Sequence, residues 1–128
     1  MKKPVLLIFL FLFFASCHQE KGEIIIATPE QVYEAVYEEA SPQLLDVRTE
    51  GEYLVSHLKN AQNICVTSDD FQEKAASLDK EKPVYVYCKG GGRSSKAAQI
   101  LRDMGFTKVY DLQGGLKNWQ LQGYETVQ

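Results

Sequence analysis

The chain of 128 residues has the length of a single domain, well below the size at which chains usually divide. Its 45% hydrophobic and 24% charged residues are typical of a globular protein and exclude a disordered or collagen-like chain. A net charge of −3 without any basic block argues against nucleic-acid binding, and three cysteines are too few for a disulfide scaffold.

The N-terminal residues differ from the rest of the chain. Lys2 and Lys3 precede an unbroken apolar run over 5–14, which is too short for a membrane-spanning helix of about 20 residues. A basic start, an apolar run and small residues are typical of a secretory signal. The run ends in Ala15, Ser16 and Cys17, which resemble a bacterial lipobox, in which the cysteine becomes the lipidated N-terminus.

We therefore expect three parts: a signal peptide over 1–16, the lipidated Cys17 with a polar tether over 17–23, and one domain over 24–128. This organisation places the protein at the bacterial cell envelope, held to a membrane by its lipid and facing the periplasm or the exterior. The alternative is an ordinary signal in which the cysteine has no role.

Along the domain, short β-rich runs alternate with helical patterns, which favours a parallel α/β sheet. The predicted strands are 24–26, 44–47, 61–66, 83–87 and 109–112. The run over 44–47 is apolar on both faces, as the central strands of parallel sheets are.

Capping signals place the first helices. Thr28 with Gln31 forms a capping box, with Pro29 in the first turn, and the helix ends before Ser41 and Pro42. Helical spacing predicts a buried face of Val32, Tyr33, Val36, Tyr37 and Ala40. A second capping box, over 49–52, opens a short helix that reaches about residue 57.

Three further helices follow from the pattern of apolar residues. Ser68 is predicted to cap a helix with Phe71, Ala75 and Leu78 turned inward. The next helix covers 93–104 and ends at Gly105, and the closing helix covers 116–122 with Trp119 as its core anchor.

The segment 88–95, with the sequence CKGGGRSS, carries the strongest chemical signal. It runs from the end of a strand, through glycines, into a helix, and sites in parallel sheets form at the carboxyl ends of strands. Gly90, Gly91 and Gly92 let the backbone turn its N–H groups inward, which makes an anion-binding nest at a helix N-terminus. Together with Lys89 and Arg93, this nest should keep Cys88 a thiolate. The alternative is a buried structural cysteine.

Four motifs in this order resemble the rhodanese family, in particular its single-domain members. The loop over 88–93 is similar to C-x-x-G-x-R, residues 44–53 to L-[IL]-D-V-R-x-x-x-E-[YF], residues 56–64 to G-H-I-x-G-A-x-N-I, and residues 112–123 to L-x-G-G-[IL]-x-x-W-x-x-x-G. The matching features span 24–124. The chain departs from the family at Ser56 and Asn60, which replace glycines, and at Cys65, where an acidic or other residue is more usual.

The resemblance implies a rhodanese-like α/β fold, with a central parallel five-stranded sheet and helices on both faces. It implies a sulfurtransferase in which the Cys88 thiolate takes a sulfane sulfur from thiosulfate or a related donor and passes it, as a persulfide, to cyanide or a thiol. The loop amides from Lys89 to Ser94 would stabilise the persulfide, and Lys89 and Arg93 would bind the small anionic donor. The acceptor could be a thioredoxin-like protein. No metal or organic cofactor is implied.

Several nearby residues have plainer interpretations. Asp46 and Arg48 end a neighbouring strand, where a supporting ion pair or loop hydrogen bonds are expected rather than direct chemistry. His57 is expected to be a structural hydrogen-bonding residue rather than a proton shuttle. The family strand order places Cys65 about two strands, roughly 9–10 Å, from Cys88, too far for a disulfide.

Two other functions stay open. One is a binding or sulfur-sensing module with this fold but no turnover. The other is a phosphatase or arsenate reductase, whose related loop, C-x5-R, is one residue longer than the loop that ends at Arg93. The shorter ring suits a sulfane sulfur better than a tetrahedral phosphate.

Overall fold

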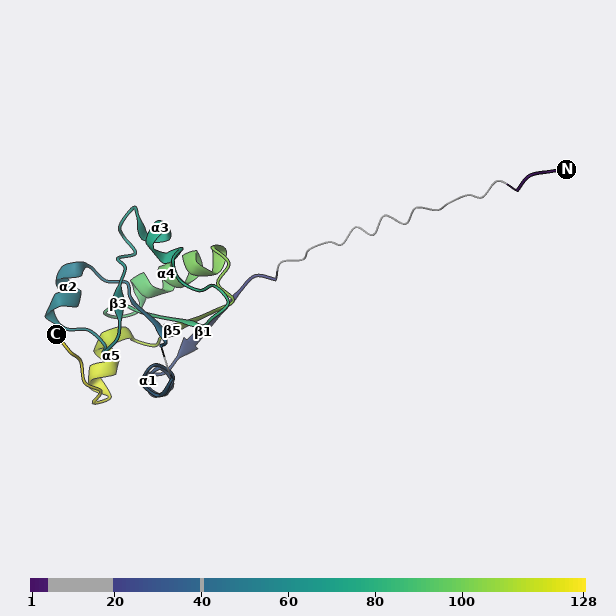
Figure 1. The fold of residues 1–128 in the computed structure, drawn as a ribbon. Coiled ribbons are helices and arrows are strands. Elements are labelled where there is room, and N and C mark those ends of the chain that lie inside the picture. Colours follow the sequence, from purple (N-terminus) through teal and green to yellow (C-terminus); the bar gives the residue numbers. More distant parts are fainter. Residues whose placement is uncertain (5–19, 40) are drawn as a thin grey trace.

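Five parallel strands form one sheet in the computed structural model, which describes residues 1–4, 20–39 and 41–128 (Figure 1). The strands are β1 (Glu23–Ala27), β2 (Gln43–Asp46), β3 (Gln62–Asn63), β4 (Val84–Tyr87) and β5 (Lys108–Leu112). Their order across the sheet is β1-β5-β4-β2-β3. The predictions for 5–19, including Cys17, and for Ala40 lie outside the described residues.

Helices cover both faces of this sheet, as Figure 1 shows. They are α1 (Pro29–Glu38), α2 (Glu50–Val55), α3 (Phe71–Ala75), α4 (Gly92–Asp103) and α5 (Gly115–Leu121). One apolar cluster joins α3 and α4 to the sheet, and a second joins α1 and α5 to its other face. The predicted fold class is therefore confirmed. None of the helices in the described residues is both long and apolar enough to cross a membrane.

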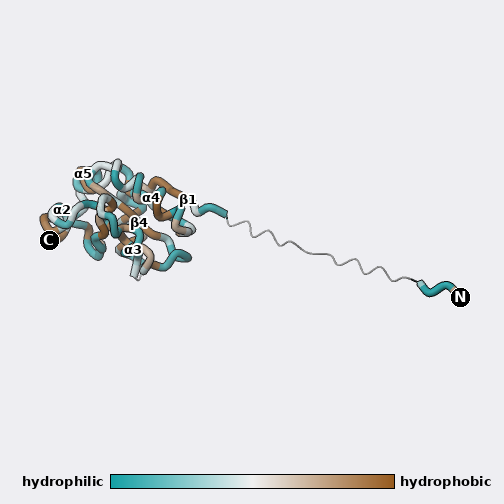
Figure 2. Tube along the Cα trace, turned by 90° about the horizontal axis from the view of Figure 1, so that it is seen from above, coloured by the Kyte–Doolittle hydropathy of each residue, from teal (hydrophilic) through white to brown (hydrophobic). Residues whose placement is uncertain are grey.

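The middle of the sheet is the most buried part of the domain. All four residues of β4 are buried, because β4 lies between β5 and β2 and is covered on both faces. Figure 2 shows apolar stretches inside the domain, whereas the polar residues that lead into β1 are teal. The strongest strand prediction thus corresponds to β4, which ends directly before Cys88.

Both predicted capping boxes are present. The Thr28 and Thr49 side chains accept from the backbone N–H groups of Gln31 and Glu52, whose own side chains accept from the backbone N–H groups of the two threonines. The second helix ends at Val55, two residues before the predicted end.

Three local predictions are wrong. The ladder of β3 covers Gln62–Asn63 rather than 61–66, because this edge strand pairs only with the end of β2. Asp70, not Ser68, is the N-cap of α3, and the Ser68 hydroxyl donates to the Asp70 carboxylate instead. Tyr33 is 42% exposed rather than buried, and its ring packs against those of neighbouring aromatic residues on the surface.

Candidate active site

Cys88 lies where β4 passes into α4, at the carboxyl edge of the sheet. Its side chain is buried, and its Sγ lies 3.0 Å from the backbone nitrogen of Gly91, which donates to it, and 3.4 Å from Ser94 Oγ. Gly91 has a φ of +120°, which only glycine adopts readily, and this conformation turns its N–H toward the sulfur. Gly90 and Gly92 have no such φ, so Gly91 is the glycine of this loop whose backbone conformation requires that residue.

Two opposing effects act on the Cys88 thiol. Burial raises its pKa, but hydrogen bonding with the Ser94 hydroxyl and with the backbone of Ser94, Gly91 and Gly90 outweighs burial, so that the pKa lies below the ordinary value. These donors sit at the N-terminus of α4, where the helix dipole also favours a negative charge. The arrangement is suited to an anionic sulfur.

A second glycine turn holds the loop from the other side. Gly115 has a φ of +62°, and a Cβ at this position would lie 2.5 Å from the carbonyl oxygen of Cys88. The close approach allows the N–H groups of Leu116 and Lys117 to donate to the carbonyl oxygens of Cys88 and Lys89, at 2.8 and 3.0 Å. The start of α5 thus fixes the backbone from which the thiol projects.

Arg93 is held by an acidic partner. Its two Nη atoms donate to the two oxygens of Glu52 at 2.7 and 2.8 Å, with about a third of each side chain exposed. This bidentate hydrogen bond, the larger cause, and burial, which opposes it, bring the pKa of Glu52 to about 2. The charge of Arg93 also acts on Cys88. Arg93 is therefore beside the sulfur, but in this structure its donors are directed at Glu52.

Lys89 directly follows Cys88 in the loop. It is exposed, and it lines a cavity of about 320 Å3 together with Lys117, Arg48 and residues of α2 and α5. Lys89 forms no ion pair with the residues that the structure describes. Its ammonium group is thus free to meet an anion that approaches Cys88.

Asp46 and Arg48 form a buried ion pair beside β4. Arg48 donates from its Nε and Nη2, at 2.6 to 3.1 Å, and from its backbone N–H to Asp46, and Nη2 also donates to the carbonyl oxygen of Ser56. The Tyr87 hydroxyl donates to Asp46 Oδ2 at 2.7 Å and accepts from the backbone N–H of Leu58. Together these bonds connect the end of β2 with the end of β4 and with the backbone of Ser56 and Leu58, which corresponds to a supporting role.

His57 and Cys65 lie outside the ring of donors around Cys88. The His57 ring stacks on Tyr53, with Nδ1 2.9 Å from the Tyr53 carbonyl oxygen, and the His57 backbone bridges to Val127. Cys65 follows β3, two strands from β4, and its Sγ lies 3.2 Å from Thr67 Oγ1. Among the described residues neither Cys65 nor Cys88 forms a disulfide.

Sequence reasoning did not identify two buried groups near the site. Tyr87 looked like an ordinary strand residue, yet burial, the largest cause, and the charge of Asp46 raise the pKa of its hydroxyl. Asp111 is the next-to-last residue of a predicted strand, and the structure buries it on the same side of the sheet as Cys88. An acidic residue in an apolar run was the available signal, but its face depends on strand register.

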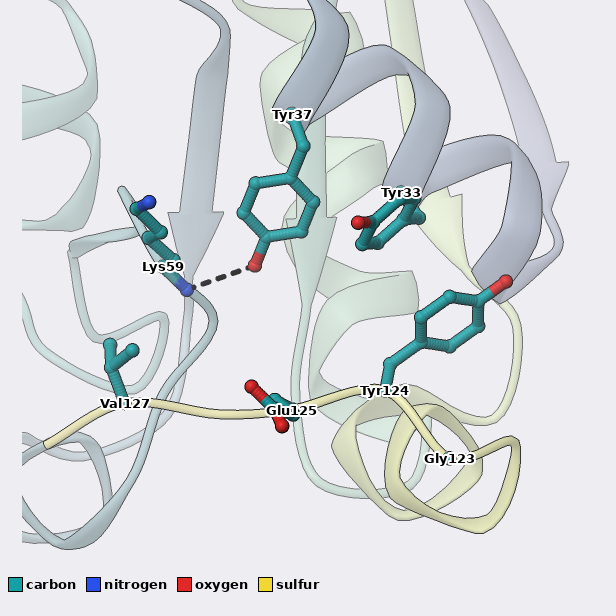
Figure 3. Close-up of a pocket in the computed structure, with 7 residues that line it drawn as sticks. All are labelled: Tyr33, Tyr37, Lys59, Gly123, Tyr124, Glu125 and Val127. Atoms are coloured by element: carbon teal, nitrogen blue, oxygen red, sulfur yellow. Dashed lines mark hydrogen bonds between the residues drawn. The ribbon is translucent and has the colours of Figure 1, made fainter.

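A larger cavity lies elsewhere. It has a volume of about 690 Å3 and is lined by three tyrosines, Lys59 and the C-terminal segment, as Figure 3 shows. None of the residues of the Cys88 loop lines it. Within the described ranges, no group of three or more His, Cys, Asp or Glu residues is placed to bind a metal ion.

Comparisons with known proteins agree with this architecture. The model of the rhodanese-like domain matches residues 28–122. The uncharacterized protein YqhL of Bacillus subtilis is 34% identical over 117 residues, which cover 90% of each chain. The thiosulfate sulfurtransferase GlpE of Coxiella burnetii is 40% identical over 77 residues, 60% of this chain and 70% of that protein. The crystal structure of the Alr3790 protein from Anabaena sp. superposes with a TM-score of 0.72 at 30% identity, over 79% of this chain and 81% of that one. The chain belongs to the family of rhodanese-like domains.

Proposed function

We propose that the protein is a sulfurtransferase that moves a sulfane sulfur from thiosulfate or a related donor to a thiol or cyanide through a persulfide on Cys88. The observation that carries this proposal is the ring of donors around a buried sulfur, with the Gly91 N–H 3.0 Å from Sγ and the pKa of the thiol lowered. The relative named thiosulfate sulfurtransferase supports the same chemistry.

The reaction has two nucleophilic steps. The Cys88 thiolate attacks the outer sulfur of thiosulfate, the S–S bond of thiosulfate breaks, and sulfite leaves with the electron pair. The acceptor then attacks the outer sulfur of the persulfide, and the Cys88 thiolate is regenerated as the leaving group. Covalent catalysis of this kind divides one difficult transfer into two easier ones.

Charge at the entrance fits an anionic donor. Lys89 is exposed and free to bind the sulfonate end of thiosulfate, whereas Arg93 adds its positive charge from its place beside Glu52. The outer persulfide sulfur would stand about 2 Å beyond Sγ, so an acceptor can reach it although Cys88 itself is buried. A small thiol or a thioredoxin-like protein is the acceptor class that we propose.

The decisive test is loading of Cys88. Incubation with thiosulfate should add the mass of one sulfur atom to the peptide that contains Cys88, and later addition of cyanide should remove it with formation of thiocyanate. Cys88→Ser should abolish both, whereas Cys65→Ser, the matched change at the other described thiol, should retain them. A comparison of cyanide, glutathione and thioredoxin would then rank the acceptors.

Two outcomes would support another function. A chain that never forms the persulfide yet binds a sulfur compound would be a sensing or binding module. Hydrolysis of p-nitrophenyl phosphate faster than sulfur transfer from thiosulfate would indicate a phosphatase.

We also propose that Cys17 carries a lipid that holds the domain at the cell envelope. The support is the apolar run over 5–14 followed by Ala15, Ser16 and Cys17. In a bacterial host, Cys17→Ser should move the protein from the membrane fraction to the soluble fraction, with Cys65→Ser as the control. An unchanged distribution would contradict the anchor.

A further inference from the structure

Asp111 is a buried carboxyl group that no step of the proposed transfer uses. Its side chain is 5% exposed, and its Oδ1 has no hydrogen-bond partner among the described residues. None of the ion pairs among the described residues includes Asp111. Because nearly all buried polar atoms in folded proteins are paired, an orphaned carboxylate oxygen points to a role that offsets its cost.

The strand register places this carboxyl group near the sulfur. β4 and β5 are parallel neighbours with Val86 opposite Asp111, and Cys88 follows Val86 by two residues. Side chains two residues apart on a strand share a face, so these three side chains point to one side of the sheet. That side is the one covered by α4, since Val86 and Cys88 belong to the same apolar cluster as the α4 residue Ala97.

Ser94, in the first turn of α4, connects the two groups. It is fully buried, its Oγ lies 3.4 Å from Cys88 Sγ, and it donates to the Gly91 carbonyl oxygen at 3.1 Å. Burial raises the pKa of Asp111, and the nearby Ser94 hydroxyl lowers it only in part. One hydroxyl thus lies against the thiol and acts on the charge of the carboxyl group.

Few other charges act on this pair. Arg93 acts on Cys88 from α4, and its donors are directed at Glu52 of α2. On the other side of Asp111, β1 presents Ile26, which cannot titrate. With so little compensation, two negative charges at Cys88 and Asp111 are disfavoured relative to one.

We propose that Asp111 is the internal acceptor of the Cys88 thiol proton, with the Ser94 hydroxyl as the relay. The S–H bond breaks and its proton passes to Ser94 Oγ, while the Ser94 hydroxyl turns from the Gly91 carbonyl oxygen and its own proton passes to the carboxylate. The products are a thiolate, an unchanged hydroxyl and a carboxylic acid, so the pair keeps a total charge of −1. The Ser94 hydroxyl then donates to the thiolate and accepts from the acid.

Asp111 is therefore a positioning residue, because it acts on the reaction only through Ser94 and Cys88. The inference rests on the proposed function only in treating Cys88 as the nucleophile. It concerns the ionisation of the thiol, which can be measured without any sulfur transfer.

The test is the pH dependence of Cys88 alkylation by iodoacetamide in the full chain, read on the Cys88 peptide by mass spectrometry. Coupled groups titrate as a pair in two macroscopic steps. The wild-type rate should rise in two steps, whereas Asp111→Asn should give one. Asp103→Asn removes the same charge from the far end of α4, where the side chain is 63% exposed, and should keep both steps. A single step with one midpoint in all three proteins would overturn the proposal.

A second measurement needs no variant. At a pH between the two steps, the ultraviolet absorbance of the thiolate should be present, and alkylation should still release about one proton per Cys88. That proton leaves Asp111 once the neighbouring negative charge is gone. A thiolate that reacts without proton release would contradict the relay. If the wild-type protein does not turn over thiosulfate but its alkylation rate still rises with pH in two steps, the proposed function is contradicted and the proton relay is not.

Discussion

Two buried aspartates flank β4, the strand that precedes Cys88, and their surroundings are opposite. Asp46, at the end of β2, accepts hydrogen bonds from Arg48 and from the Tyr87 hydroxyl. Asp111, near the end of β5, has an oxygen without a partner in the described part of the chain. Asp46 pairs in register with Tyr87 and Asp111 with Val86, so the two carboxyl groups serve opposite faces of the sheet.

This difference separates a carboxyl group that stabilises the fold from one that is able to exchange a proton. A buried charge whose partners are complete fixes the backbone around it and has little freedom to exchange protons. A buried carboxyl group beside a thiol, with one shared hydroxyl between them, can change its protonation state as the thiol does. The face that carries Asp46 therefore fixes the surrounding backbone, whereas the face that carries Asp111 is the one that we propose to control the ionisation of Cys88.

Asp46→Asn should have the largest effect on stability. It leaves the Arg48 guanidinium buried without a counter-charge, which should reduce the free energy of unfolding by about 3–5 kcal/mol. Chemical denaturation would measure this loss, with Asp103→Asn as the exposed control. A loss below about 1 kcal/mol would show that the ion pair does not stabilise the fold and would contradict the structural role of Asp46.

Gly115→Ala should have the next largest effect, because the turn after β5 needs both a left-handed backbone and a missing side chain. The strain and the contact with the Cys88 carbonyl oxygen should together cost about 2–3 kcal/mol. The same displacement should slow alkylation of Cys88. Gly51→Ala is the control, since a Cβ there meets no atom within 4 Å. Equal stability of the two variants would contradict the close approach.

Glu52→Gln should lower stability by about 1 kcal/mol at neutral pH, because glutamine can keep the capping box but not the charge opposite Arg93. The folded-state pKa of Glu52 is about 2, below its ordinary value of 4.5. Its stabilisation is therefore present above pH 4.5 and is lost as the pH falls toward 2. Denaturation curves of the wild type and the variant should converge over that range. If the difference in stability between the two proteins persists at pH 2, the charge of Glu52 is not the cause of that difference.

Asp111→Asn should have the smallest effect on stability and the opposite sign to Asp46→Asn. Burial raises the folded-state pKa of Asp111, so any stability linked to this group is present below its ordinary pKa of about 4 and is lost as the pH rises through the raised value. The variant should be as stable as the wild type in acid and slightly more stable at neutral pH. Thermal unfolding at both pH values would measure this. A large loss would show that Asp111 is structural.

Much of the fold followed from the sequence because the signals were local. Two capping boxes, the apolar strand before Cys88 and the glycine loop each depend on residues close together in the chain. The errors arose where tertiary contacts determine the exposure of a side chain or the length of a strand. Tyr33 has helical spacing for burial but meets other aromatic rings at the surface, and β3 is limited by the strand beside it.

The candidate site divides in the same way. Cys88, its loop and the Asp46–Arg48 pair could be identified as candidates from motifs within single segments. The pairing of Arg93 with Glu52 joins residues 41 apart in sequence, and the position of Asp111 depends on which residue of β4 it faces. No pattern within one segment contains that information.

The donors nearest to the sulfur have a consequence for engineering this domain. Apart from the Ser94 hydroxyl, they are main-chain groups of the loop. Substitution of an exposed side chain such as Lys89 can therefore change which sulfur donor binds, while the main-chain donors around the Cys88 sulfur stay the same. The backbone conformation of the loop sets the reactivity of the thiol, whereas the exposed side chains set the selectivity for the substrate. The two properties can therefore be varied separately.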